Sequence, residues 1–284
     1  MSMSSMQFPT PFASLLRSLG MLVCVATCTL SCSVLIDTKS EQCRVDADCT
    51  SRGVAFANTT CDLQQNVCVA GLGCAETPNR SNDTVLLSFA IEFLTPPKEP
   101  KSTIVRVCGG SADFHCDSPI GDPITVSYGE VAAVPVPTGY QGVIEVKNPD
   151  ALPALYYLGR PIPVDTHGYD LTLSTPGTAV LLGLATHQDV DPNLGIVVIT
   201  ARDCARQPLS NVAVMSDFTG AIQFYFQNKT PQPSLTLTTA EGAAGYANVP
   251  EGFVSIGGTL NGRPLTGSAG AARNGWVTYM ELFP

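Results

Sequence analysis

Cysteine is the residue type in this chain whose number and spacing could do the most chemistry. The 284 residues include 11 cysteines, more than an ordinary intracellular protein carries. A cysteine can bind a metal ion, act as a nucleophile or redox partner, or form a structural disulfide. No Cys-x-x-Cys pair occurs, although that spacing is typical of zinc sites and redox motifs. The pattern therefore favours disulfides formed in an oxidising compartment.

The first 31 residues are predicted to be an export signal. Residues 19–30 form a mostly apolar run of 12 residues, and Arg17 is the only basic residue before it. Crossing a bilayer takes about 20 apolar residues, so the run is too short to span. Its length and position are typical of a signal peptide. We therefore expect residues 1–31 to be absent from the mature protein.

The predicted signal ends at Thr29-Leu30-Ser31-Cys32, which resembles a bacterial lipobox, although Thr29 departs from the usual Leu or Val. The resemblance implies that Cys32 is diacylated and anchors the chain to the membrane, as an outer-membrane lipoprotein of the bacterial cell envelope. Several acyl chains make such an anchor stable. Two alternatives stay open: lipid attachment at Cys28, and ordinary cleavage with secretion.

The cysteines that remain after Cys32 are candidates for disulfides, and their even number allows full pairing. They are Cys43, Cys49, Cys61, Cys68, Cys74, Cys108, Cys116 and Cys204. The first five lie in a polar block with too few large apolar residues to form a core, so disulfides would stabilise this Cys-rich neck over residues 32–78. One connectivity consistent with the spacing is Cys43–Cys61 and Cys49–Cys68, with Cys74 paired to Cys204 or another distant cysteine. Cys108 and Cys116 flank a Gly-Gly turn, which favours a stapled loop over a redox pair.

Catalytic and metal-binding patterns are weak. The three histidines are His115, His167 and His187, and no Gly-x-Ser-x-Gly motif accompanies them. A hydrolase triad assembled from separate loops stays open as the least supported function. Residues 189–195 alternate oxygen ligands as a calcium loop does, but Thr200 stands where a bidentate Glu is needed. We predict no catalytic residue, no metal site and no cofactor.

Aromatic side chains offer one speculative ligand platform. Alternation on a strand places Phe224 and Phe226 on one face and Tyr225 on the other. We predict that Tyr225, together with Tyr156 and Trp276, forms an exposed platform on which a sugar ring could stack.

The composition limits the partners. Only 14% of residues are charged, 44% are hydrophobic, and the net charge is −9. Nucleic-acid binding needs a basic surface, so the acidic balance argues against it. The apolar content argues against a fully disordered chain.

The elements that would position these residues are predicted to be almost entirely strands. Short β-branched and aromatic runs are separated by Gly, Pro, Asn and Asp, which is typical of a sandwich or barrel. The predicted strands are 85–93, 103–107, 124–126, 131–136, 143–146, 196–199, 212–214, 222–226, 235–237, 253–256 and 276–279. One helix is predicted after Thr175-Pro176 and is stopped by Asp191-Pro192, which gives a helical connector over 173–194.

The two strand-rich regions, 79–172 and 195–284, are predicted to be related to one another. At an offset of 113, Val136-Pro137-Thr138-Gly139-Tyr140 matches Val249-Pro250-Glu251-Gly252-Phe253, and Val143 matches Ile256. Pro and Gly make a tight turn between two strands, and we expect the aromatic residue to return to the core.

The second region resembles the carboxypeptidase regulatory-like domain, a transthyretin-like seven-stranded sandwich. The matching segments are Gly195 to Ile199, Asp203, Pro208 to Val214, Thr239 to Gly242 and Val249 to Ile256. In the first region Val126 replaces the Thr of the Thr-x-x-Gly step. The resemblance implies an all-β fold of two tandem transthyretin-like (Ig-like) sandwiches behind a small Cys-rich module.

The whole layout resembles uncharacterised bacterial surface lipoproteins. This implies a non-catalytic envelope protein that presents β-sandwich modules for structural or adhesive work, with the membrane, a polysaccharide or another envelope protein as partner. The alternative is a carbohydrate-binding module, because some relatives of the fold bind sugars. Fold alone does not give function.

Overall fold

The computed structural model describes residues 43, 44, 48, 51, 59–62, 67–70, 74, 83–109, 116–162 and 164–284. The predicted signal peptide, the lipidation at Cys32, and the residues Cys49 and His115 lie outside the described residues. Strands β1 (Thr59–Asp62) and β2 (Val67–Ala70) pair in the predicted neck. Among the described residues, no helix has the length and apolarity needed to cross a membrane.

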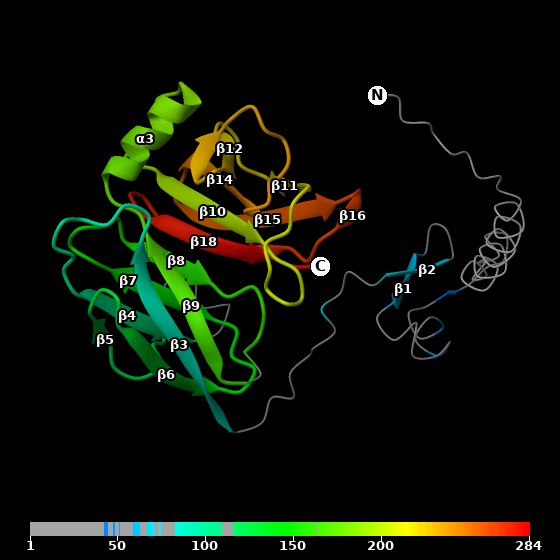
Figure 1. The fold of residues 1–284 in the computed structure, drawn as a ribbon, viewed down its shortest axis with the longest axis horizontal. Coiled ribbons are helices and arrows are strands. Elements are labelled where there is room, and N and C mark those ends of the chain that lie inside the picture. The colour runs from blue at the N-terminus through cyan, green and yellow to red at the C-terminus, as the bar shows by residue number, and fades with distance from the viewer. Residues whose placement is uncertain are drawn as a thin grey trace, which may run out of the picture. The chain divides into compact units, whose positions relative to one another are not determined.

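The chain divides into two compact units, and the second comprises Asn58–Thr60 and Ala70–Pro284. Its described part is mostly β, as the sequence predicted (Figure 1). The strands before the helix are β3 (Thr84–Phe93), β4 (Thr103–Cys108), β5 (Ile124–Val126), β6 (Val131–Pro137), β7 (Val143–Lys147), β8 (Ala154–Tyr157) and β9 (Thr166–Leu173). After helix α3 (Gly177–Thr186) come β10 (Gly195–Ala201), β11 (Val212–Ser216), β12 (Ile222–Gln227), β13 (Thr230–Gln232), β14 (Ala243–Val249), β15 (Gly252–Leu260), β16 (Arg263–Pro264), β17 (Ser268–Ala272) and β18 (Val277–Leu282).

Strand order repeats between the two halves of this unit. In the first half β3 pairs antiparallel with β6 and parallel with β9. In the second half β10 pairs antiparallel with β14 and parallel with β18. The remaining strands repeat as well, because β4, β7 and β8 pair antiparallel in that order, as do β11, β15 and β17. The internal sequence match thus coincides with a repeated topology.

The matched aliphatic residues of the two halves are buried, whereas the matched aromatic residues differ. Val136 and Val249 are fully buried at the ends of β6 and β14. Tyr140 returns to the core as expected, and its hydroxyl donates a hydrogen bond to the Cys108 carbonyl at 2.6 Å. Phe253, in contrast, is 65% exposed, so the prediction was wrong there. Its neighbour Val254 takes the inward position on β15, and alternation turns Phe253 outward.

A nine-stranded sheet joins the two halves, in the order β13-β12-β14-β10-β18-β8-β7-β4-β5. The junction is a parallel pairing of β8 with β18 that places Ala154 opposite Val277 and Tyr157 opposite Met280 (Figure 1). Two tandem sandwiches joined by a helical connector were predicted from the sequence. The structure instead shows a continuous sheet through both halves, in which the edge strand of each half satisfies the backbone hydrogen bonds of the other.

The two cores contact opposite faces of this shared sheet. The three-stranded sheet β6-β3-β9 contributes to one core, which also contains Tyr156, and the sheet of β11, β15, β16 and β17 contributes to the other, which contains Tyr157. Helix α3 packs Ala179 and Leu182 against the first core. It ends at His187, whose φ is 55°, and therefore stops before the predicted boundary at Asp191-Pro192.

Several strand predictions need correction. Residues 235–237 were predicted as a strand but lie outside the strands, partly in a bend. Strands β1, β2, β8, β9, β13, β14, β16 and β17 were missed. In β14 the small residues Ala and Gly hide the alternation of apolar and polar side chains that indicates a strand. Gly245 is required there, because a Cβ at this position would lie 2.5 Å from the Phe224 ring.

Candidate functional site

Two disulfides are described in full. Cys108 bonds to Cys116, with Cα atoms 4.9 Å apart, and Cys74 bonds to Cys204, with Cα atoms 5.1 Å apart. These are pairs that the cysteine spacing had put forward. Cys43 is also disulfide-bonded. The predicted pairs Cys43–Cys61 and Cys49–Cys68 extend outside the described residues and stay predictions.

The Cys74–Cys204 disulfide ties residue 74 to a loop that is firmly held in the β body. Arg160 donates a hydrogen bond from Nη1 to the Cys204 carbonyl at 2.9 Å. Arg202 donates to the Arg206 carbonyl at 2.8 Å, and its Nε lies 3.2 Å from a carboxylate oxygen of Glu281 on β18. The crosslink therefore connects residue 74 to the surroundings of the last strand within the second unit.

The same loop is held by aromatic contacts. The Arg206 guanidinium lies 4.8 Å from the centre of the Tyr169 ring. The Tyr169 hydroxyl donates a hydrogen bond to Glu281 at 3.0 Å. Burial and the neighbouring Glu281 charge raise the pKa of Tyr169 far above its usual range, so this tyrosine stays protonated and keeps donating.

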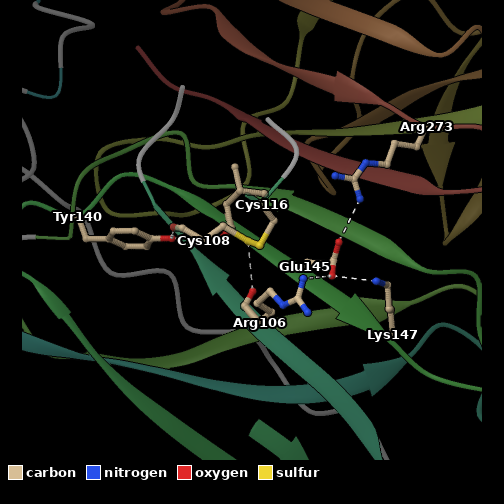
Figure 2. The surroundings of a disulfide bond; sticks show 8 residues. Arg106, Cys108, Cys116, Tyr140, Glu145, Lys147 and Arg273 are labelled. Carbon is tan, nitrogen blue, oxygen red and sulfur yellow. Dashed lines mark hydrogen bonds and ion pairs between the residues drawn. A yellow bond between two sulfur atoms is a disulfide. The ribbon is translucent and has the colours of Figure 1, made fainter. Parts of the chain in front are cut away.

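A buried carboxylate with three basic neighbours forms the most strongly charged cluster near the Cys108–Cys116 disulfide (Figure 2). Glu145 on β7 is buried, and its oxygens lie 3.5 Å from Arg106 Nη1, 3.0 Å from Lys147 Nζ and 3.0 Å from Arg273 Nη1. Strand register places Arg106 on β4 directly opposite Glu145. Arg273 follows β17, so the cluster connects the two halves of the unit.

Opposing effects set the ionisation of Glu145. Burial raises the pKa of the carboxyl group. Hydrogen bonds from Lys147 and Arg273, with the charges of Lys147 and Arg106, outweigh burial and lower that pKa below its ordinary value. The carboxylate therefore stays ionised and fixes the positions of the three basic side chains.

The predicted aromatic platform does not exist as an exposed surface. Tyr156 is 7% exposed and Tyr225 is 2% exposed. Tyr156 stacks on Tyr279 with ring centres 4.4 Å apart and donates a hydrogen bond to the Thr172 carbonyl. The Tyr225 hydroxyl accepts from the Val214 backbone N–H at 3.1 Å. The prediction assumed one solvent-facing side, whereas both faces of these strands are covered.

Trp276 lies elsewhere and is partly covered by the charged cluster. Its ring centre is 4.6 Å from the Arg273 guanidinium and 5.3 Å from Lys147 Nζ. Such cation–π contacts hold the basic groups against the ring. The sequence did not indicate the Glu145 cluster, although a lone Glu inside the apolar run 143–146 was a visible anomaly.

The other predicted site residues are dispersed. The backbone of His167 lies on β9, and His187 lies exposed at the end of α3. Asp191 accepts hydrogen bonds from the backbone and side chain of Asn193, at 2.9 and 3.0 Å, which is a local turn and not a calcium loop. Within the described ranges, no three His, Cys, Asp or Glu residues gather as metal ligands.

Comparisons with known proteins give distant matches only. No family model and no curated protein matches the chain. Three similar solved structures are the TIE protein of Bacillus anthracis (15% identity, 70% of this chain, 33% of that chain, TM-score 0.22), a streptococcal ancillary pilin (12%, 69%, 68%, 0.23) and GBS52, the minor pilin of Streptococcus agalactiae (10%, 70%, 95%, 0.23). The chain thus spans about a third of the first of these proteins. At such TM-scores the matches assign no role to any residue of this chain.

Proposed function

We propose that this chain is a non-catalytic protein of the bacterial cell envelope that presents a disulfide-stabilised β body for structural or adhesive work. The observation that carries the proposal is the Cys74–Cys204 disulfide, which crosslinks residue 74 to the β body within the second unit. Disulfides persist in oxidising compartments outside the cytosol. A crosslink at the start of the β region suits a protein that is held at its N-terminus.

The fold part of the proposal is a pair of transthyretin-like units of the carboxypeptidase regulatory-like kind. It is supported by the repeated strand order, in which the first and last strands of each half pair in parallel. The halves share a sheet, so they form one compact unit and not two separate domains joined by a linker.

The anchoring part of the proposal places a diacylated cysteine at position 32. Its test is incorporation of labelled palmitate by cells that express the full chain. We expect Cys32→Ala to abolish labelling and to release the protein from the membrane fraction, whereas the matched control Cys28→Ala keeps both. Labelling that survives Cys32→Ala refutes the anchor at Cys32 and leaves lipid attachment at Cys28, whereas a wild-type chain that takes up no label leaves ordinary cleavage with secretion.

A carbohydrate-binding role is the second candidate. The specific observation that favours it is the surplus of basic side chains around Glu145 on a sheet face, because acidic polysaccharides are bound through such groups. A hydrolase role has no comparable support, since the backbone of His167 lies on β9 and His187 follows α3, on different elements.

A further inference from the structure

The Glu145 cluster carries more positive charge than its single carboxylate neutralises. Three basic side chains, Arg106, Lys147 and Arg273, share Glu145. They leave a local surplus of positive charge in a chain whose net charge is −9. Three basic groups around one carboxylate give the cluster a net positive charge, which attracts a second anion.

These basic groups lie on an accessible face of the sheet. Register places Ile104 opposite Lys147 and Arg106 opposite Glu145, so all four side chains project from one face of β4 and β7. Ile104 is 51% exposed, and the side chains of Lys147 and Arg106 are 50% and 38% exposed. Ile104, Lys147 and Arg106 are therefore accessible to a ligand around the buried Glu145, whereas the Arg273 side chain, at 17% exposed, is less accessible.

The side chains are also held in place before any ligand arrives. Arg106, Lys147 and Arg273 all form ion pairs with the Glu145 carboxylate, as Figure 2 shows. The Trp276 ring contacts Lys147 and Arg273 as well. Ordering a long basic side chain costs conformational entropy on binding, and this cost is lower where the side chain is already fixed. An arginine fork matches a carboxylate or sulfate in two-point geometry.

We propose that this face, defined by Ile104, Arg106, Lys147 and Arg273, binds an acidic polysaccharide through its carboxylate groups. The inference deepens the carbohydrate-binding alternative and does not depend on the lipid anchor. A strand interior offers no unpaired backbone N–H or C=O to a peptide, because both ladders of β4 and β7 are paired within the sheet. Recognition on such a face therefore relies on side chains, which suits a polymer with regularly spaced anionic groups and hydroxyls.

The test is binding of the exported full chain to alginate, a linear polymer of uronic acids, in a quartz-crystal or calorimetric assay. We expect binding at low salt that weakens as added salt shortens the screening length. Arg106→Gln combined with Lys147→Gln should weaken binding about tenfold. Lys229→Gln, which removes one charge from the exposed turn between β12 and β13 at the far end of the sheet, is the control and should leave it unchanged.

Further arms separate the possible outcomes. Lys147→Gln alone keeps two basic partners on Glu145 and should weaken binding about threefold even if the double variant folds poorly. Neutral dextran should not bind. Equal binding of poly-glutamate and alginate would overturn the polysaccharide assignment, and so would absence of alginate binding or equal loss in the Lys229→Gln control. None of these results alters the palmitate test of the anchor.

Discussion

The Cys74–Cys204 disulfide closes a loop that contains the entire first half of the β body and part of the second. The two cysteines are 130 residues apart, whereas Cys108 and Cys116 are 8 apart. In the chain-entropy description a crosslink restricts the unfolded ensemble, and its contribution grows with the logarithm of loop length. This gives ~5 kcal/mol for the long loop and ~2.5 kcal/mol for the short one.

The perturbation is the double variant Cys74→Ala/Cys204→Ala. Cys204 is exposed, so the alanine there loses little packing and the change in stability reports mainly on the crosslink. We expect the free energy of unfolding in guanidinium to fall by about 4–5 kcal/mol, with the near-ultraviolet circular dichroism of the folded protein unchanged. An effect of that size is a large share of the stability of a typical domain.

The control is Cys108→Ala/Cys116→Ala. Both cysteines are buried, so this variant adds a packing loss of about 1 kcal/mol to the smaller entropic term. We expect a total decrease of about 3–4 kcal/mol. A decrease below about 1 kcal/mol for the Cys74–Cys204 variant would refute the reasoning, because residue 74 would then not constrain the β body in the unfolded chain.

Two further predictions concern buried polar groups. Tyr157→Phe removes the acceptor of the Ala271 N–H, which lies 2.9 Å from the hydroxyl, and should lower the free energy of unfolding by about 1–3 kcal/mol in urea denaturation; no change would show that another acceptor replaces it. Glu145→Gln should cost about 3 kcal/mol at neutral pH, because the basic partners lose their counter-charge. The folded-state pKa of Glu145 is lowered, so its contribution is present above the unfolded-state pKa and is lost as the pH falls through the folded-state value. The difference between wild type and Glu145→Gln should therefore shrink in acid, and a pH-independent difference contradicts the ion-pair account.

Much of the strand pattern could be predicted because it follows from local alternation. In β3 the odd-numbered residues from Val85 to Phe93 are apolar in the sequence and buried in the structure. The internal repeat matched Val136, near the end of β6, with Val249, and Val143 in β7 with Ile256 in β15. The short spacing of Cys108 and Cys116 suggested their pairing, because a loop of that length brings its ends together at little entropic cost.

The charged cluster could not be predicted, because it depends on long-range register. Arg273 reaches Glu145 across 128 residues of sequence. Only the pairing of β4 with β7 places Arg106 beside the same carboxylate. Local pattern indicates which residues face one side of a strand, but not which other strand, loop or layer covers that side.

Tyr225 illustrates the same limit in the opposite direction. Alternation correctly separated it from Phe224, which is buried in the first core. The inference that the other side faces solvent failed, because a second layer covers that side and Tyr225 belongs to the second core. A strand buried on both faces loses the contrast between polar and apolar positions on which the argument relied.

The shared sheet distinguishes this unit from two separate sandwiches. If the halves were separate sandwiches, β8 and β18 would each be an edge strand with unpaired backbone groups and one solvated side. Instead they pair with each other, and β8 contributes Tyr156 to one core and Tyr157 to the other. Removing either half would expose the edge strand β8 or β18 of the other half. If β8 remained, either Tyr156 or Tyr157 would lose the core in which it is buried. The folded unit is therefore the pair of halves, and both the crosslink to residue 74 and the basic face around Glu145 belong to that one compact unit.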